Sequence, residues 1–265
     1  MKILVCDRLE EKVLDKFEEL GEITNISESK TKNEDLISNI VDTEIVVIRS
    51  GTKINKDILE NANNLKIIAR CGVGVDNVDV EEATNKKIYV TNSPNANIIS
   101  VAELTIGLII SAARKIHVSN NSLKDKKWDR NKFLGTELYQ KQLGLVGFGK
   151  AAKEVAKRLS AFGMNIVFYD PYVDSSTIEA KKVDLDELLK TSDVISIHVV
   201  KTEETTNLIN NEKLNLIKKG GILVNTSRGG IIDEESLFQR ANEDFIFAGL
   251  DVFSQEPPEI NETFS

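Results

Sequence analysis

Residues 147–152 read GFGKAA and fit the pattern G-x-G-x-x-G/A, in which closely spaced glycines leave room for a phosphate. The pattern follows an apolar run at 143–146 and opens a helical pattern, which is the context that gives it meaning. Gly147 permits a tight turn, Gly149 lets backbone N–H groups approach a pyrophosphate, and Ala152 keeps the helix close to the strand. The amino end of that helix would present N–H donors and a positive dipole end to the phosphates. These residues predict a dinucleotide-binding turn.

An acidic residue, Asp170, lies where a dinucleotide-binding turn requires a carboxylate for the ribose. Asp170 follows the next apolar run, 165–169, and lies 18 residues after Ala152. There it would accept hydrogen bonds from both ribose hydroxyls and repel a 2′-phosphate, so the predicted cofactor is NAD rather than NADP. The alternative is that the glycines form an ordinary turn and that Asp170 merely begins a loop.

Short runs rich in β-branched residues alternate with helical patterns along the whole chain, which predicts parallel sheets with helices on both faces. Strands are predicted at 3–5, 44–48, 65–69, 88–90, 143–146, 166–169, 194–198, 222–225 and 247–250. Helices are predicted at 9–20, 98–120, 150–162, 186–189, 208–217 and 235–241. The turn-rich segment TNSPNAN at 91–97 is the best boundary, so we predict two α/β domains joined near 92–98.

The composition limits the class of protein and its partners. With 41% hydrophobic and 29% charged residues, the 265-residue chain is predicted to be soluble and globular rather than collagenous, disordered or membrane-spanning. A net charge of -8 argues against nucleic acid as a partner. Two cysteines and two histidines leave no predicted metal site. No signal peptide or membrane span is predicted, so we expect a cytoplasmic protein without a membrane partner.

Further motifs lie between about residues 46 and 258. They are RSGTK at 49–53, GVGVDNVD at 72–79, PNAN at 94–97, AELT at 102–105, NTSRGGIID at 225–233 and DVFSQEPP at 251–258. Together with the glycine turn, they resemble the D-isomer-specific 2-hydroxyacid dehydrogenases, which oxidise a D-2-hydroxy acid with NAD or run the reverse reaction. The resemblance is greatest to members that act on a small phosphorylated 2-hydroxy acid, D-3-phosphoglycerate.

The resemblance implies a fold for each domain. Residues 95–265 would form a Rossmann-type doubly wound parallel sheet that binds NAD, without the family's last strand. Residues 1–94 would form a smaller flavodoxin-like α/β substrate-binding domain, without the family's return helices. The family usually dimerises through the long helix that matches 98–120, so a homodimer through the NAD-binding domain is expected. The apolar positions of that helix are equally consistent with a buried core helix.

The resemblance also assigns catalytic and substrate-binding roles. Arg228 would hold the substrate carboxylate and polarise the C2 oxygen, because a guanidinium binds oxygens through a planar fork. Glu256 would orient and support a catalytic histidine, as an acid does in a triad. Backbone N–H groups of one loop would bind the same carboxylate, and two further side chains would lie near the phosphate. These residues are Gly72, Val73 and Gly74, and then Arg49 and Asn97.

The cofactor contacts that the resemblance implies are spread over several loops. They are Gly147, Gly149, Lys150 and Ala151 at the pyrophosphate, Asp170 at the ribose, Thr226 and Ser227 along the ribose and nicotinamide, Asp251 at the carboxamide, and Val73 and Val199.

The sequence departs from the family in two places. The family's catalytic histidine lies in a Pro-His-x-Gly segment beyond the match to Glu256, whereas this sequence ends at Ser265. His198 matches a family histidine near the cofactor that is not the proton acceptor, and VK at 200–201 replaces the proline-leucine pair that follows it. Two interpretations stay open: a stretch of a longer active enzyme, or an NAD(H)-binding module with impaired turnover. A glyoxylate/hydroxypyruvate or D-lactate-type enzyme is the alternative for the substrate.

Overall fold

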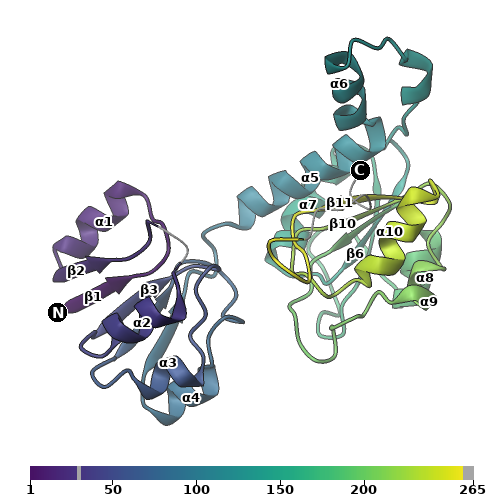
Figure 1. The fold of residues 1–265 in the computed structure, drawn as a ribbon. Helices are drawn as coiled ribbons and strands as arrows, with labels where there is room; N and C mark the ends of the chain where they lie inside the picture. The colour runs from purple at the N-terminus through teal and green to yellow at the C-terminus, as the bar shows by residue number, and fades with distance from the viewer. Residues whose placement is uncertain (29–30, 259–265) are drawn as a thin grey trace. The chain divides into compact units, whose positions relative to one another are not determined.

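The computed structural model describes residues 1–28 and 31–258, and the chain divides into two units, Met1–Asn97 and Ile98–Ser265. Each unit contains one parallel sheet with helices packed on it (Figure 1). The predicted α/β class with two parallel sheets is confirmed. The division falls at the end of the turn-rich segment at 91–97 that the sequence marks as a boundary.

Unit 1 (Met1–Asn97) has a five-stranded sheet in the order β2-β1-β3-β4-β5. This is the strand order of flavodoxin-like folds, which confirms the predicted fold of this part of the chain. The strands are β1 (Lys2–Val5), β2 (Glu22–Asn25), β3 (Ile45–Ile48), β4 (Ile67–Arg70) and β5 (Tyr89–Asn92). The helices are α1 (Glu11–Glu18), α2 (Asn33–Ile40), α3 (Lys56–Glu60) and α4 (Val80–Asn85). The central strand β3 is buried along its whole length because helices cover both faces of the sheet.

Unit 2 (Ile98–Ser265) has a six-stranded parallel sheet in the order β11-β10-β9-β6-β7-β8. This is the order of Rossmann-type dinucleotide-binding folds, and the chain reverses direction across the sheet at β6. The strands are β6 (Gln142–Val146), β7 (Asn165–Tyr169), β8 (Lys181–Lys182), β9 (Val194–Ile197), β10 (Gly221–Asn225) and β11 (Ile246–Leu250). The helices are α5 (Ile98–Arg114), α6 (Ile116–Lys124), α7 (Lys150–Ser160), α8 (Leu185–Thr191), α9 (Asn211–Leu214) and α10 (Glu234–Asn242), with a 3-10 turn η1 (Arg130–Phe133).

The core of unit 2 fixes the helix that follows the glycine turn. Ala152 on α7 is fully buried, and so are the rings of Phe148 and Phe168, which stack with centroids 4.0 Å apart. A small residue at 152 lets α7 lie close to the sheet, as the sequence pattern predicts. The amino end of α7 is therefore held rigidly at the carboxyl edge of β6.

The predicted long helix at 98–120 is wrong in its length. It ends as α5 at Arg114, and a second helix, α6, begins at Ile116. Lys115 between them has a left-handed backbone, with φ of 52°. The carbonyl of Ala113, which a continuing helix would use, instead accepts a hydrogen bond from the N–H of Thr136 at 2.7 Å. A returning loop therefore ends α5.

Two edge strands escaped prediction. β2 reads EITN and has no buried residue, and β8 is two exposed lysines. The periodicity of apolar residues reflects which side chains are buried. Strands that are held at a sheet edge mainly by backbone hydrogen bonds bury few side chains, so they leave little apolar pattern in the sequence.

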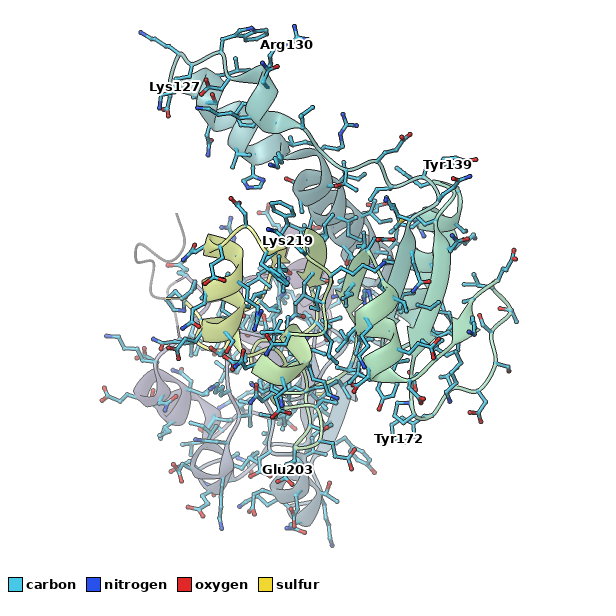
Figure 2. All side chains as sticks on the ribbon, turned by 90° about the vertical axis from the view of Figure 1, so that its right-hand side faces the viewer. Lys127, Arg130, Tyr139, Tyr172, Glu203 and Lys219 are labelled. Atoms are coloured by element: carbon cyan, nitrogen blue, oxygen red, sulfur yellow. The ribbon has the colours of Figure 1, made fainter. Side chains whose placement is uncertain are left out.

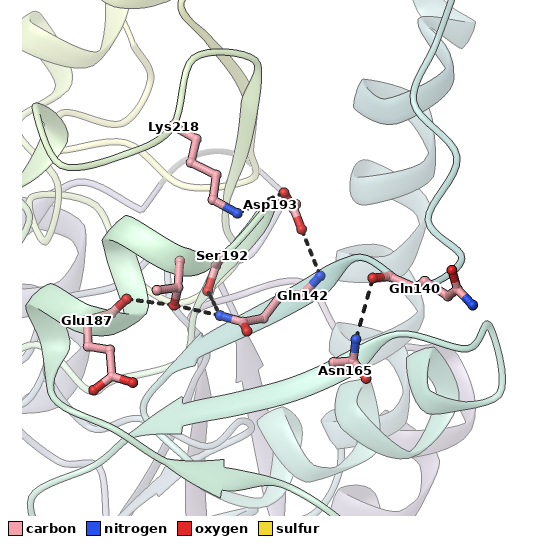
Figure 3. A network of polar contacts seen from close by, with 8 residues as sticks. Gln140, Gln142, Asn165, Glu187, Ser192, Asp193 and Lys218 are labelled. Atoms are coloured by element: carbon pink, nitrogen blue, oxygen red, sulfur yellow. Dashed lines mark hydrogen bonds and ion pairs between the residues drawn. The ribbon is translucent and has the colours of Figure 1, made fainter.

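The amino edge of the unit 2 sheet is joined by a polar network (Figure 3). The Asp193 carboxylate accepts from the N–H of Gln142 at 2.9 Å and from Lys218 Nζ at 3.0 Å. The Gln142 side chain donates to Thr191 Oγ1 at 2.7 Å. Burial raises the pKa of Asp193, but the bonds from Gln142 and Lys218 outweigh it and leave the pKa below its usual value. The network connects the starts of β6, β9 and β10.

Candidate functional site

The predicted cofactor residues of unit 2 meet at the carboxyl edge of its sheet. Gly147 follows β6 and Asp170 follows β7, on one side of the reversal point. Val199, Thr226 and Asp251 follow β9, β10 and β11 on the other side. Open α/β sheets bind ligands outside the carboxyl ends of their strands at such a point. In Figure 2, Tyr172 and Glu203, which lie beyond β7 and β9, mark this end of the unit, and Lys219, just before β10, lies toward the other.

The two glycines of the turn are required for different reasons. Gly147 has φ of 88°, and a Cβ there would lie 2.8 Å from the backbone nitrogen of Val199. Gly149 is the N-cap of α7 with an ordinary φ of -76°, and a Cβ there would meet no atom of the described residues within 4 Å. The N-cap residue Gly149 has no side chain that could cap this end of α7. Open space and helix N–H donors at Gly149 fit a pyrophosphate. Lys150 is exposed beside it, and Ala151 is partly buried.

Asp170 connects the glycine turn to the next strand. Its Oδ2 accepts from the N–H of Phe148 and its Oδ1 accepts from the N–H of Tyr172, both at 2.8 Å. Asp170 is partly exposed, and each oxygen retains a lone pair for a ribose hydroxyl. The carboxylate therefore has the loop role, and it keeps acceptor capacity for the ribose role, which stays a prediction.

Two hydroxyl groups in the turn after β10 are hydrogen-bonded to protein atoms. The Thr105 hydroxyl donates to the carbonyl of Val101 and lies 2.7 Å from Thr226 Oγ1. Since Thr105 has one proton, the Thr226 hydroxyl donates to Thr105 and points to α5. The Ser227 hydroxyl donates to the carbonyl of Val199. Any cofactor contact from these residues must use a lone pair or the backbone.

Arg228 is held in the same turn by a residue that sequence reasoning did not single out. Asn225 is 2% exposed; its Nδ2 donates to the Arg228 carbonyl at 2.8 Å and its Oδ1 accepts from the N–H of Ser227 at 3.0 Å. Arg228 is partly buried, and its Nη1 donates to the Ser227 carbonyl at 2.7 Å. A polar amide that ends an apolar strand is the signal that could have identified Asn225.

Glu256 and Asp251 lie in the segment after β11, and both are exposed. Glu256 Oε1 accepts from the N–H of Phe253 at 3.1 Å, so its carboxylate folds back on its own loop. The loop packs on the Arg228 turn, because a Cβ on Gly229 would lie 1.8 Å from the Phe253 carbonyl oxygen.

His198 is placed as a neutral residue. Its Nε2 lies 2.9 Å from Ser196 Oγ, and burial lowers the pKa of the imidazole to about 4. Such a ring stays uncharged near neutral pH and is a weak proton acceptor. The expectation that His198 is not the proton acceptor stays a prediction.

The predicted substrate residues of unit 1 lie at the carboxyl edge of its own sheet. Arg49 follows β3 and is exposed, and the loop at 72–74 follows β4. A Cβ on Gly72 would lie 1.3 Å from Nη1 of Arg70, a buried arginine that the sequence analysis missed. The Gly72 N–H donates to the Arg70 carbonyl at 2.9 Å. Because its N–H is already bound, Gly72 is removed from the predicted donors to a substrate carboxylate. A glycine at this position leaves room for the Arg70 side chain.

The remaining predicted residues of unit 1 are accessible. Val73 is 39% exposed, and its carbonyl accepts from Asn92 Nδ2 at 2.6 Å. Gly74 is partly buried, and Asn97 is exposed at the end of the unit.

Two features are absent from residues 1–28 and 31–258. These residues contain no group of three or more His, Cys, Asp or Glu that could hold a metal ion. Their helices include none that is long and apolar enough to cross a membrane.

Comparison with known proteins identifies the family. Residues 106–265 match the family model described as "D-isomer specific 2-hydroxyacid dehydrogenase, NAD binding domain". The chain belongs to the D-isomer specific 2-hydroxyacid dehydrogenase family. The expectation of an NAD-binding Rossmann domain is confirmed by this match and by the strand order of unit 2.

Particular relatives differ in the substrate they are named for. The chain is 48% identical to a D-3-phosphoglycerate dehydrogenase of Methanocaldococcus jannaschii over 98% of this chain and 50% of that protein. It is 45% identical to a hydroxypyruvate reductase of Thermotoga maritima over 97% of this chain and 84% of that protein. A D-lactate dehydrogenase of Aquifex aeolicus, solved with NAD and lactic acid, has a TM-score of 0.86 at 27% identity, covering 100% of this chain and 83% of that one. The chain thus spans about half the length of the first of these relatives.

Proposed function

We propose that this chain carries the NAD-binding and substrate-binding residues of an NAD-dependent oxidoreductase that converts D-3-phosphoglycerate to 3-phosphohydroxypyruvate, the first step of the phosphorylated route to serine. The observation that carries the proposal is the carboxyl edge of unit 2, where the open position at Gly149 and the Arg228 turn follow strands on either side of the reversal point. The 48% identity to a D-3-phosphoglycerate dehydrogenase supports the choice of substrate.

In this proposal the chain's own residues hold the cofactor. Bound NAD would supply the acceptor for the C2 hydride. The donors at the start of α7, with Gly147, Gly149, Lys150 and Ala151, bind the pyrophosphate, and Asp170 binds the ribose. Along the rest of the dinucleotide, contacts come from the remaining predicted set: Thr226, Ser227, Asp251, Val199 and Val73.

The proposed substrate contacts are cationic or backbone groups. Arg228 binds the carboxylate and polarises the C2 oxygen, since the turn built by Asn225 fixes its backbone. Val73 and Gly74 offer N–H groups, and Arg49 and Asn97 bind the phosphorylated end. Glu256 orients the group that accepts the hydroxyl proton. We do not propose His198 as that acceptor, because its pKa of about 4 makes it a poor base.

A second candidate is reduction of hydroxypyruvate or a related unphosphorylated acid, which the 45% identity to a hydroxypyruvate reductase favours. Binding measurements on the 265-residue chain separate the two. With NADH present, titration with D-3-phosphoglycerate, D-glycerate and D-lactate is expected to give the lowest Kd for the phosphorylated acid. Equal or tighter binding of D-glycerate would contradict the proposed substrate, and tighter binding of NADPH than of NADH would contradict the cofactor assignment.

We also propose that the protein is a cytoplasmic homodimer joined through unit 2. Helix α6 and the turn η1 have no buried residues, and they project from the unit (Figures 1 and 2). Leu134 is 82% exposed and Trp128 is 77% exposed on this arm. A hollow of about 580 Å³ between α5 and α7 is lined by Glu103, Ile106, Lys157, Arg158, Ala161 and Phe162. Exposed apolar surface of this kind marks an interaction site.

Analytical ultracentrifugation of the unmodified chain should give twice the chain mass. The double variant Trp128→Glu, Leu134→Glu should give the mass of a monomer. A monomeric unmodified chain would refute the proposed homodimer.

A further inference from the structure

The loop that carries Arg49 is held through four backbone polar groups, two of Arg49 and two of Thr52, by two side chains from elsewhere in unit 1. Asp7 Oδ2 accepts from the N–H of Arg49 at 2.5 Å and from the N–H of Thr52 at 3.2 Å. Asn77 Nδ2 donates to the carbonyl oxygens of the same two residues, at 2.7 and 2.6 Å. Both main-chain polar groups of Arg49 and of Thr52 are therefore bound by Asp7 and Asn77.

This clamp is assembled by the sheet of unit 1. Asp7 lies just beyond β1, Arg49 directly follows β3, and Asn77 lies in the loop after β4. Strand β3 pairs with β1 on one side and with β4 on the other, so the register brings the two clamping residues to either side of the loop. A Cβ on Gly51 would lie 2.6 Å from Asp7 Oδ1, which shows how closely the carboxylate approaches the loop.

The clamp anchors the backbone and leaves the cationic end of Arg49 accessible. Thr52, at one end of the loop, is 4% exposed, whereas Arg49 is exposed. Arg49 Nη1 donates to the carbonyl of Arg8 at 3.4 Å, so the segment that supplies Asp7 also guides the guanidinium. Fixing the backbone in advance reduces the conformational entropy that a ligand must remove from the arginine.

Charge alone does not explain a carboxylate at this place. An Asp beside an arginine that binds an anion weakens the attraction, because the two charges partly cancel. Its two hydrogen bonds to the loop N–H groups give it a different role. We propose that Asp7 and Asn77 are positioning residues that hold Arg49 to receive the phosphorylated end of the substrate. The inference deepens the proposed function and rests on it for the identity of the ligand.

Ligand binding by the full chain in the presence of NADH tests the proposal. Asp7→Ala and Asn77→Ala are each expected to raise the Kd for D-3-phosphoglycerate by about tenfold and to leave the Kd for D-glycerate unchanged. Asp7→Asn, which keeps an acceptor oxygen, should restore most of the affinity. Asn61→Ala removes a comparable bond to the Asp57 carbonyl elsewhere in unit 1 and is the control. Equal losses for both ligands, with a lower melting temperature, would show a merely structural role and overturn the proposal.

A double-mutant cycle adds a second criterion. If Asn77 acts through Arg49, then Asn77→Ala should have little further effect on phosphorylated-ligand affinity in the Arg49→Ala background. Fully additive effects would mean that Asn77 acts independently of Arg49, which contradicts the proposal.

A readout without substrate separates this inference from the proposed function. Burial raises the pKa of the Cys71 thiol, the Arg49 and Arg70 guanidiniums lower it, and Asp7 raises it. Burial leaves the Cys71 pKa above its usual value, and it should rise further if Arg49 moves away; the other cysteine, Cys6, is buried with a pKa of about 12. Asn77→Ala should raise the Cys71 pKa as Arg49→Ala does, and an unchanged pKa would overturn the positioning role. If that pKa rises while Arg49→Ala leaves D-3-phosphoglycerate affinity unchanged, the substrate proposal fails and the positioning of Arg49 stands.

Discussion

Asp170 Oδ2 accepts a hydrogen bond from the backbone N–H of Phe148 at 2.8 Å, so the carboxylate predicted to bind ribose also closes the glycine turn. Replacement with Asn removes the charge that would repel a 2′-phosphate, and it keeps an acceptor for only one of the two N–H groups, those of Phe148 and Tyr172, that Asp170 binds. Asp170→Asn is therefore expected to lower the melting temperature modestly and to narrow the preference for NADH over NADPH by about tenfold. Fluorescence titration with both dinucleotides measures it; an unchanged ratio would remove Asp170 from the ribose site.

Substitution of Gly149 should reduce NADH affinity, whereas substitution of Gly147 should reduce the stability of the fold. Gly149→Val fills open space at an ordinary φ, so the fold should survive while NADH affinity falls by about 100-fold, because the pyrophosphate can no longer approach. Gly147→Ala should instead lower stability, since its φ is positive and the methyl group would meet the backbone of Val199. Gly220→Ala is the matched control, with φ of 79° and no described atom within 4 Å of the added methyl group. NADH titration and thermal melting distinguish these effects; a Gly149→Val protein that binds NADH normally would contradict the pyrophosphate site.

The hydroxyl of Thr226 should matter for stability and not for the cofactor. Thr226→Val removes its hydrogen bond to Thr105 and is expected to cost about 1 kcal/mol in the free energy of unfolding. NADH affinity should stay within about twofold, because that hydroxyl points to α5. Urea unfolding and NADH titration of the same variant check both statements. A large loss of affinity without a loss of stability would mean that the hydroxyl turns to the ribose.

Stability should fall in acid through His198. Its pKa is about 4 in the folded protein against an ordinary value of 6.5, so between these values the unfolded chain binds the extra proton. Stability is therefore retained above pH 6.5 and is lost as the pH falls toward 4. Between pH 7 and pH 5 the loss from this group is expected to be about 2 kcal/mol. Urea unfolding of the unmodified protein and of His198→Gln at both values measures it; equal pH dependence of the two would contradict the assignment.

Sequence reasoning located the central strands of both sheets, but it did not predict the short helices α2, α3 and α4, although these also bury apolar side chains. The strands β6, β7, β9, β10 and β11 were predicted because their runs are apolar and β-branched, and the glycine turn was placed correctly between β6 and α7. Strand β8 and the break at Lys115 were missed, since one is two exposed lysines and the other depends on a distant loop that binds the carbonyl of Ala113.

The candidate site was predictable only where a motif is local. Gly147, Gly149 and Asp170 follow from spacing along the chain. Asp7 and Asn77 lie 42 and 28 residues from Arg49, and only the register of β1, β3 and β4 brings them together. The space that Arg70 takes at Gly72 likewise exists only in three dimensions.

The Asp193 network lies at the edge of the unit 2 sheet opposite the glycine turn, with the full length of the strands separating the two. Substitutions that change stability and substitutions that change the functional site can therefore accumulate at opposite edges of the same sheet. A lineage that adapts to heat can change Gln142 and Lys218 at the amino edge of the sheet, while the residues at its carboxyl edge stay unchanged.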